Sequence, residues 1–153
     1  METSVNRNAE YAGLYREIAD ILTYQGENIF KIRSYRRATE TLVALNEPVE
    51  DILSRGDLDK LPGFGAAIQQ KTAEMIATGS CRLLDRLREE VPAGIRYLLR
   101  LEGLTPEAVR GLQNAIGVDS IEALRRAAVE GRLDDLPLKP AVVERIQRAA
   151  SLL

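Results

Sequence analysis

Apolar residues recur every three to four positions along most of the chain, and this spacing is typical of amphipathic helices. The first long run extends from Tyr11 to Leu22, and Gly26 offers a stop. A second run follows Asn28, a candidate N-cap, and continues to Leu45. No window alternates strictly between apolar and polar residues, so the pattern predicts an all-α protein without strands.

The rest of the chain predicts shorter helices with tight connections. Pro48 is expected to begin a short helix that ends near Gly56, and two further helices are expected over about residues 66–78 and 80–90. Pro92 and Pro106 each stand where a first helical turn would start. We therefore expect a helical bundle with tandem helical hairpins, arranged as two small packed subdomains.

A repeat lies in the connections between the predicted helices. The segment 56–62 (GDLDKLP) is echoed at 131–137 (GRLDDLP), and a third version, LEGLT, occupies 101–105. Each copy reads as a helix, a turn anchored by leucine and a second helix.

The first copy continues into the sequence LPGFG at 61–65. Gly63 and Gly65 allow backbone conformations that are closed to residues with a Cβ atom, and they clear side chains from the turn. Successive amides, including those that open the following helix, would then point outward and form an anion site. A nucleic-acid phosphate is the natural occupant, and it would be bound without sequence specificity. A plain turn between two helices with a glycine cap is the alternative.

Composition limits the chemistry that the chain supports. The 153 residues contain no histidine and a single cysteine, Cys81, which excludes an internal disulfide, a zinc site and a histidine-based catalytic triad. No signal peptide or membrane-length apolar run is present, so a cytoplasmic protein is expected, nucleoid-associated if bacterial. The net charge is −2, so any nucleic-acid binding must come from local geometry.

The sequence around the first turn resembles known DNA repair proteins. Leu61–Gly65 is similar to the helix-hairpin-helix motif, and residues 26–38, 61–71, 77–79 and 90–94 resemble the amino-terminal region of bacterial family X DNA polymerases. The resemblance implies a flexible tail at 1–8, a lyase-like domain at 9–90 and a second helix-hairpin-helix-like domain at 91–153. It stops before the polymerase palm, so the chain alone is not expected to be a polymerase.

The resemblance also implies a catalytic residue. Lys71 matches the lysine whose amine attacks the aldehyde of a 5′-deoxyribose phosphate, forms a Schiff base and permits β-elimination. A lysine at the edge of the apolar stripe that extends its amine to solvent is the alternative. Phe30, Ala66, Ala67 and Leu83 depart from the family's usual residues, which include basic ones. The candidate DNA and phosphate ligands are Lys31, Arg33, Tyr35, Arg36, Lys60, Gly63, Phe64, Gly65 and Ala66.

The resemblance further implies a monovalent cation, Na⁺ or K⁺, held by the backbone carbonyls of Asp59, Leu61 and Phe64, and no other cofactor. The other hairpins depart from the motif, because Thr105 replaces the second glycine and Pro140 removes an amide. We therefore expect only the first hairpin to bind phosphate.

Three functions remain open. The first is a repair module for gapped, nicked or abasic-incised DNA with lyase activity at Lys71. The second is DNA recruitment without chemistry, on behalf of a separate polymerase or nuclease. The third is a protein-interaction adaptor.

Overall fold

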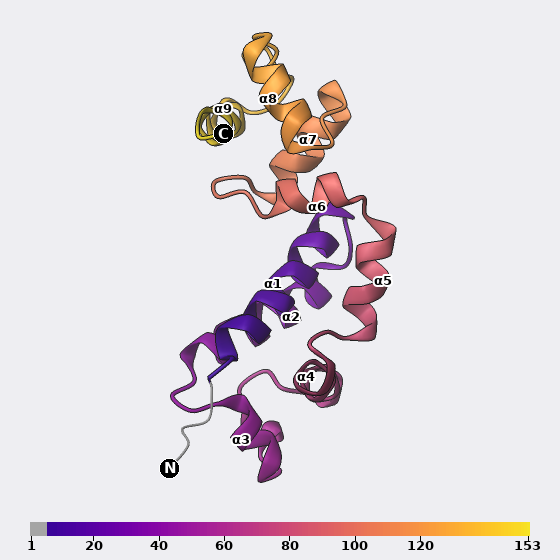
Figure 1. Cartoon of the computed structure of the whole chain (residues 1–153), viewed down its shortest axis with the longest axis vertical. Helices are drawn as coiled ribbons and strands as arrows, with labels where there is room; N and C mark the ends of the chain where they lie inside the picture. The colour runs from indigo at the N-terminus through magenta and orange to yellow at the C-terminus, as the bar shows by residue number, and fades with distance from the viewer. Residues whose placement is uncertain (1–5) are drawn as a thin grey trace. The chain divides into compact units, whose positions relative to one another are not determined.

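The computed structural model of the protein describes residues 6–153, and this part of the chain is helical without a strand (Figure 1). The elements are α1 (Asn8–Tyr24), α2 (Ile29–Ala44), α3 (Val49–Ser54), the 3-10 helix η1 (Leu58–Lys60), α4 (Ala66–Thr78), α5 (Arg82–Glu90), α6 (Ala93–Leu99), α7 (Pro106–Ile116), α8 (Ile121–Val129) and α9 (Pro140–Ser151). The predicted all-α class is confirmed. None of the described helices has the length and apolar character needed to cross a membrane.

The helix boundaries follow local chemistry. Asn28 caps α2, because its side-chain oxygen accepts a hydrogen bond from the amide of Phe30 at 2.8 Å. Pro106 occupies the first turn of α7 as expected, whereas Pro48 and Pro92 are the N-cap residues before α3 and α6. Helix α5 begins two residues later than expected, because Gly79 ends α4 in the left-handed conformation (φ +84°) and the chain needs a short connector after it.

The sequence repeat corresponds to a repeated way of ending a helix. Gly56 (φ +78°) follows α3, and the next amide, of Asp57, donates to the Ile52 carbonyl at 3.0 Å. Gly131 (φ +71°) follows α8, and the amide of Arg132 donates to the Ala127 carbonyl at 2.9 Å. Both are Schellman-type ends, which place glycine in the left-handed conformation after the last helical turn.

The described residues form two compact units, one running to Leu22 and resuming over Gly26–Leu87, the other comprising Thr23–Gln25 and Arg88–Leu153. In the first unit α1 lies beside α2 (Figure 1), and the Tyr15 ring of α1 stacks on the Tyr35 ring of α2. Its most deeply buried large side chains are Tyr15, Ile18, Ile21, Leu42, Met75, Leu84 and Leu87.

The start of α1 is tied into the first unit. Residues 1–5 of the expected N-terminal tail lie outside the described residues. Asn8 opens α1 and is buried, its side-chain amide donating to the Glu47 carbonyl at 2.8 Å and its side-chain oxygen accepting from the Val49 amide at 2.9 Å. Asn8 is therefore part of the folded unit, although we expected the N-terminal tail to include it.

The second unit has its own apolar core. Ile95, Leu98, Leu112, Leu124 and Ile146 are completely buried, and they come from α6, α7, α8 and α9. Tyr24 joins this unit through a hydrogen bond to the side chain of Gln113, and its ring lies 5.1 Å from the Arg110 guanidinium.

Candidate nucleic-acid interface

The first hairpin is a type II turn. The Phe64 amide donates to the Leu61 carbonyl at 3.1 Å, with Pro62 and Gly63 as the two central residues. Gly63 has φ +78°, the conformation that the third residue of this turn requires. The turn therefore needs glycine at position 63, as predicted.

Gly65 does not use the conformational freedom of glycine, although it keeps side chains clear of the turn as expected. Its angles, φ −71° and ψ 177°, are the extended conformation of an ordinary helix N-cap, which any residue adopts. A Cβ atom built there meets nothing within 4 Å. What glycine contributes at position 65 is an unobstructed surface rather than an unusual backbone conformation.

The N-terminus of α4 is open. No side chain caps this helix, and within residues 6–153 the amides of Gly65, Ala66 and Ala67 donate no hydrogen bond. All three residues are exposed. Unpaired amides at a helix N-terminus carry a partial positive charge and attract anions. The Phe64 amide, in contrast, closes the turn, and the Phe64 ring is buried.

Two side chains that the sequence did not single out hold the hairpin in place. The Thr41 hydroxyl of α2 donates to the Pro62 carbonyl at 2.8 Å, and the side-chain amide of Gln69 donates to the Phe64 carbonyl at 2.8 Å. The sequence could not have identified these two contacts, because a polar side chain on a helix surface is equally consistent with exposure to solvent.

The three carbonyls expected to bind a monovalent cation are oxygen ligands, the kind that such hard ions prefer. Two of them already accept hydrogen bonds, Leu61 from the Phe64 amide and Phe64 from Gln69. A carbonyl oxygen has two lone pairs, so each retains one for another partner. The cation site at Asp59, Leu61 and Phe64 stays a prediction, with the Gln69 amide directed at one of its ligands.

Lys71 and Tyr35 lie together in the first unit. The Lys71 side chain is half-buried on α4, and its Nζ atom lies 6.0 Å from the centroid of the Tyr35 ring. That ring stacks on Tyr15 with centroids 6.1 Å apart and planes inclined by 20°. The Tyr15 hydroxyl lies 2.7 Å from the Thr72 hydroxyl and 3.0 Å from the Ile68 carbonyl. The residue beside Lys71 is thereby anchored to α1.

Burial dominates the electrostatics of this cluster. Desolvation raises the pKa of the Tyr15 hydroxyl well above its ordinary value and is also the main cause of the raised pKa of Tyr35. The charge of Arg86 on α5 partly opposes the shift in the pKa of Tyr35. Burial likewise raises the pKa of the Cys81 thiol, which the charge of Lys71 slightly opposes. The charge of Glu74 acts on the pKa of the same thiol in the opposite direction and more strongly than Lys71, so charges of both signs reach this cluster.

The remaining predicted ligands are scattered. Lys31 and Arg33 are exposed on α2. Arg36 forms an ion pair with Asp20 at 2.8 Å, and the exposed Lys60 pairs with Asp57 at 3.2 Å. The structure joins Tyr35 to Lys71 and places Gly63 to Ala66 in one hairpin.

The Asp57 carboxylate has a structural role in the connector that precedes the first hairpin. Asp57 pairs with both Arg55, at 3.0 Å, and Lys60. Among the described residues, no three side chains of histidine, cysteine, aspartate or glutamate gather in a way that would hold a metal ion. Through these two ion pairs the Asp57 carboxylate stabilises the connector between α3 and η1.

The second hairpin has the same turn but a closed helix end. The Leu104 amide donates to the Leu101 carbonyl at 3.2 Å, and Gly103 has φ +88°. Thr105, in an extended conformation (φ −90°), caps α7 by accepting a hydrogen bond from the Ala108 amide at 3.2 Å, and Pro106 removes another amide. The threonine hydroxyl thus acts as the N-cap of α7.

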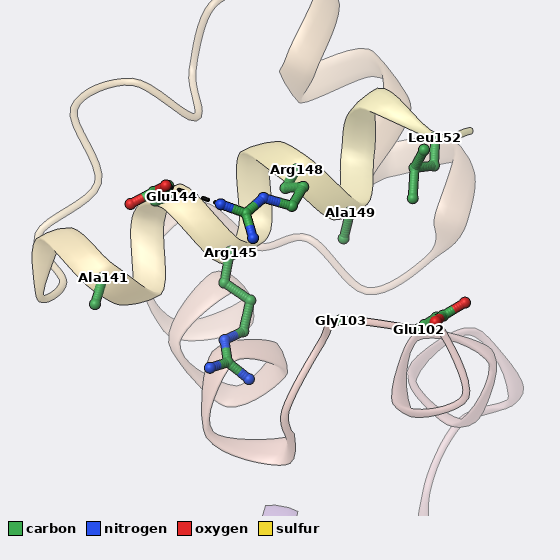
Figure 2. A pocket seen from close by; sticks show the side chains of 8 residues that line it. All are labelled: Glu102, Gly103, Ala141, Glu144, Arg145, Arg148, Ala149 and Leu152. Atoms are coloured by element: carbon green, nitrogen blue, oxygen red, sulfur yellow. Dashed lines mark hydrogen bonds and ion pairs between the residues drawn. The ribbon is translucent and has the colours of Figure 1, made fainter.

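A groove of about 490 Å³ lies between the second hairpin and α9, lined by Glu102, Gly103, Ala141, Glu144, Arg145, Arg148, Ala149 and Leu152 (Figure 2). Glu144 and Arg148 form an ion pair of 2.9 Å along α9. Figure 2 shows this pair as a dashed line and Arg145 extending away from the helix. The charges of opposite sign balance in this groove, so it lacks the positive character of the α4 N-terminus.

The comparisons with known proteins concern the part that carries the open hairpin. Residues 6–81 match the family model described as a helix-hairpin-helix domain. This helix-hairpin-helix domain contains α1, α2, the first hairpin and α4, and it includes Lys71.

A relative extends the similarity into the second unit. The chain is 29% identical over 123 residues to the DNA polymerase/3'-5' exonuclease PolX of Bacillus subtilis (strain 168). The alignment covers 80% of this chain and 21% of the relative, so the chain spans about a fifth of the length of the protein it matches. The inferred resemblance to the amino-terminal part of bacterial family X polymerases is confirmed.

Proposed function

We propose that the chain binds DNA through the first hairpin and the open N-terminus of α4. The observation that carries this proposal is the set of unpaired, exposed amides at Gly65, Ala66 and Ala67, directly after a tight turn that projects no long side chain at position 63 or 65. A phosphate oxygen approaches such amides closely and is stabilised by their combined dipoles.

Binding of this kind reads the sugar-phosphate backbone and is independent of base sequence. Because few cations surround the hairpin, the affinity is modest and falls steeply with salt concentration. The similarity to a protein named as a DNA polymerase and exonuclease supports gapped, nicked or abasic-incised DNA as the ligand. In this proposal the domain delivers such DNA to a polymerase or nuclease, on the same chain or on another.

We further propose 5′-deoxyribose-phosphate lyase activity at Lys71. The Lys71 amine adds to the C1′ aldehyde of the sugar, water leaves, and the resulting imine makes the C2′ proton acidic. Loss of that proton breaks the C3′–O3′ bond and frees the DNA strand, and water then hydrolyses the imine. The half-buried Lys71 side chain, whose amine lies 6.0 Å from the centroid of the Tyr35 ring, supports this role.

Borohydride trapping on a 5′-incised abasic duplex tests the chemistry, and a gel shift with the same duplex tests the binding. We expect wild type to give both a shift and a covalent adduct. Lys71→Ala should lose the adduct and keep the shift, whereas Lys139→Ala, which removes an exposed lysine from the second unit, should keep both.

The outcomes separate the candidate functions. A shift without an adduct in wild type contradicts the lyase and leaves a DNA-recruitment domain. The absence of both contradicts DNA binding and leaves a protein-interaction adaptor, which the net charge of −2 and the closed second hairpin would suit.

A further inference from the structure

The side chain of Arg37 lies against the hairpin turn. A Cβ atom at position 63 would stand 2.7 Å from Cδ and 2.9 Å from Cγ of Arg37. Cβ atoms in proteins do not come this close to atoms to which they are not bonded. The aliphatic part of Arg37 therefore occupies the space beside Gly63 that any other residue would fill. Glycine at position 63 therefore has two effects: it allows the positive φ of the turn, and it leaves room for the Arg37 side chain.

A second contact between α2 and the hairpin helps to position Arg37. The hydroxyl of Thr41, one turn later on α2, donates a hydrogen bond to the Pro62 carbonyl at 2.8 Å. Residues four apart share a helix face, so Thr41 and Arg37 contact successive residues of one turn. A side chain that is already held against its site loses less conformational entropy when a ligand binds.

The Arg37 guanidinium is also available for a ligand. No hydrogen bond or ion pair engages it among residues 6–153, although Glu40 lines the same shallow depression next to Pro62. Its neighbour Arg36, which we expected to bind phosphate, is instead paired with Asp20 at 2.8 Å. Arg37 is an exposed residue.

We infer that Arg37 is a further DNA-phosphate ligand of the first hairpin, positioned by the gap that Gly63 leaves. The inference rests on the proposed DNA-binding function. A guanidinium presents two parallel N–H groups that match the oxygens of a phosphate, and such charge-assisted pairs are stronger than neutral hydrogen bonds. The amides of the α4 N-terminus and the Arg37 fork would then hold phosphates on the same stretch of backbone.

The test compares Arg37→Gln with Arg16→Gln, which removes another exposed arginine, on α1, and changes the net charge by the same amount. Binding of the full chain to a fluorescent one-nucleotide-gapped duplex is measured over a series of salt concentrations. We expect Arg37→Gln to bind about tenfold more weakly at low salt. The slope of log affinity against log salt should also fall by about 0.9, the contribution of one phosphate contact.

Arg37→Lys separates charge from geometry. It should restore the salt slope but not the full affinity, because an ammonium group cannot pair with phosphate through a planar fork. Equal affinity and slope for Arg37→Gln and Arg16→Gln, with wild type binding normally, would overturn the inference and leave the proposed function intact. Failure of wild type to bind would overturn both. Circular dichroism checks that each variant is folded.

Discussion

Replacing Gly63 by alanine should destabilise the first unit and distort the hairpin. The alanine must adopt φ +78°, which costs an L-residue about 1–2 kcal/mol. Its Cβ atom must also displace Arg37, whose Cδ stands 2.7 Å from the ideal position. Because Arg37 is an exposed residue that makes no ion pair or hydrogen bond among residues 6–153, its displacement adds little to the free energy of unfolding. We therefore expect a loss of about 1–2 kcal/mol, or about 2–8 °C in Tm.

Two other glycines provide matched controls. Gly56 has the same φ of +78° but nothing within 4 Å of an added Cβ, so Gly56→Ala should lose a similar amount of stability without moving Arg37. Gly65 has φ −71° and open space around it. At Gly65, alanine restricts the unfolded chain but is a poorer N-cap, so these effects oppose one another and the change should stay within about 0.5 kcal/mol.

Urea unfolding followed by circular dichroism measures all three variants, and DNA binding is recorded on the same samples. Gly63→Ala should weaken binding beyond what its stability loss explains, since it moves Arg37, whereas Gly56→Ala should bind as wild type does. The reasoning is refuted if Gly63→Ala is as stable as Gly65→Ala, because the turn would then not require a positive φ at that position.

The buried hydroxyl of Tyr15 bonds to Thr72 at 2.7 Å, so Tyr15→Phe should lower the free energy of unfolding by about 1–2 kcal/mol in urea, and an unchanged midpoint would contradict this contact. Lys60 and Arg55 hold the pKa of Asp57 below its ordinary 3.8. Asp57 therefore stabilises the fold above pH 3.8, and this contribution disappears as the pH falls through the lowered pKa. Asp57→Asn should be less stable than wild type at pH 7 and nearly as stable near pH 2, and a deficit that persists at low pH would contradict this assignment.

Much of the fold could be predicted from the sequence because its signals are local. Apolar spacing, the Asn28 cap and the glycines after α3 and α8 act within a few residues of where they stand. The expected bounds of α4, Ala66 to Thr78, match the structure for the same reason: glycine lies at both ends. The turn at Gly63 was also predictable, since a Pro-Gly pair at its centre is typical of type II turns.

The missed features depend on contacts between distant residues. Tyr15 is one apolar position among many in α1, and only the packing of α1 on α2 makes it the support of Tyr35. Arg36 and Arg37 are adjacent and chemically identical, yet one faces Asp20 and the other Gly63. At Gly65 the sequence could not distinguish between an unusual backbone conformation and an unobstructed surface, because only the backbone angles show that this residue is an ordinary N-cap.

The most direct test of DNA binding at the α4 N-terminus is the affinity of Gly65→Asp for gapped DNA. The aspartate side chain has room at this position and is a good N-cap, so it should satisfy the free amides and leave stability unchanged or slightly higher. Its carboxylate would occupy the place proposed for a phosphate and repel it. We predict a folded, stable variant whose binding is lost, with Gly65→Asn, which caps without charge, less affected. A stable Gly65→Asp variant that binds gapped DNA as tightly as wild type would contradict the account.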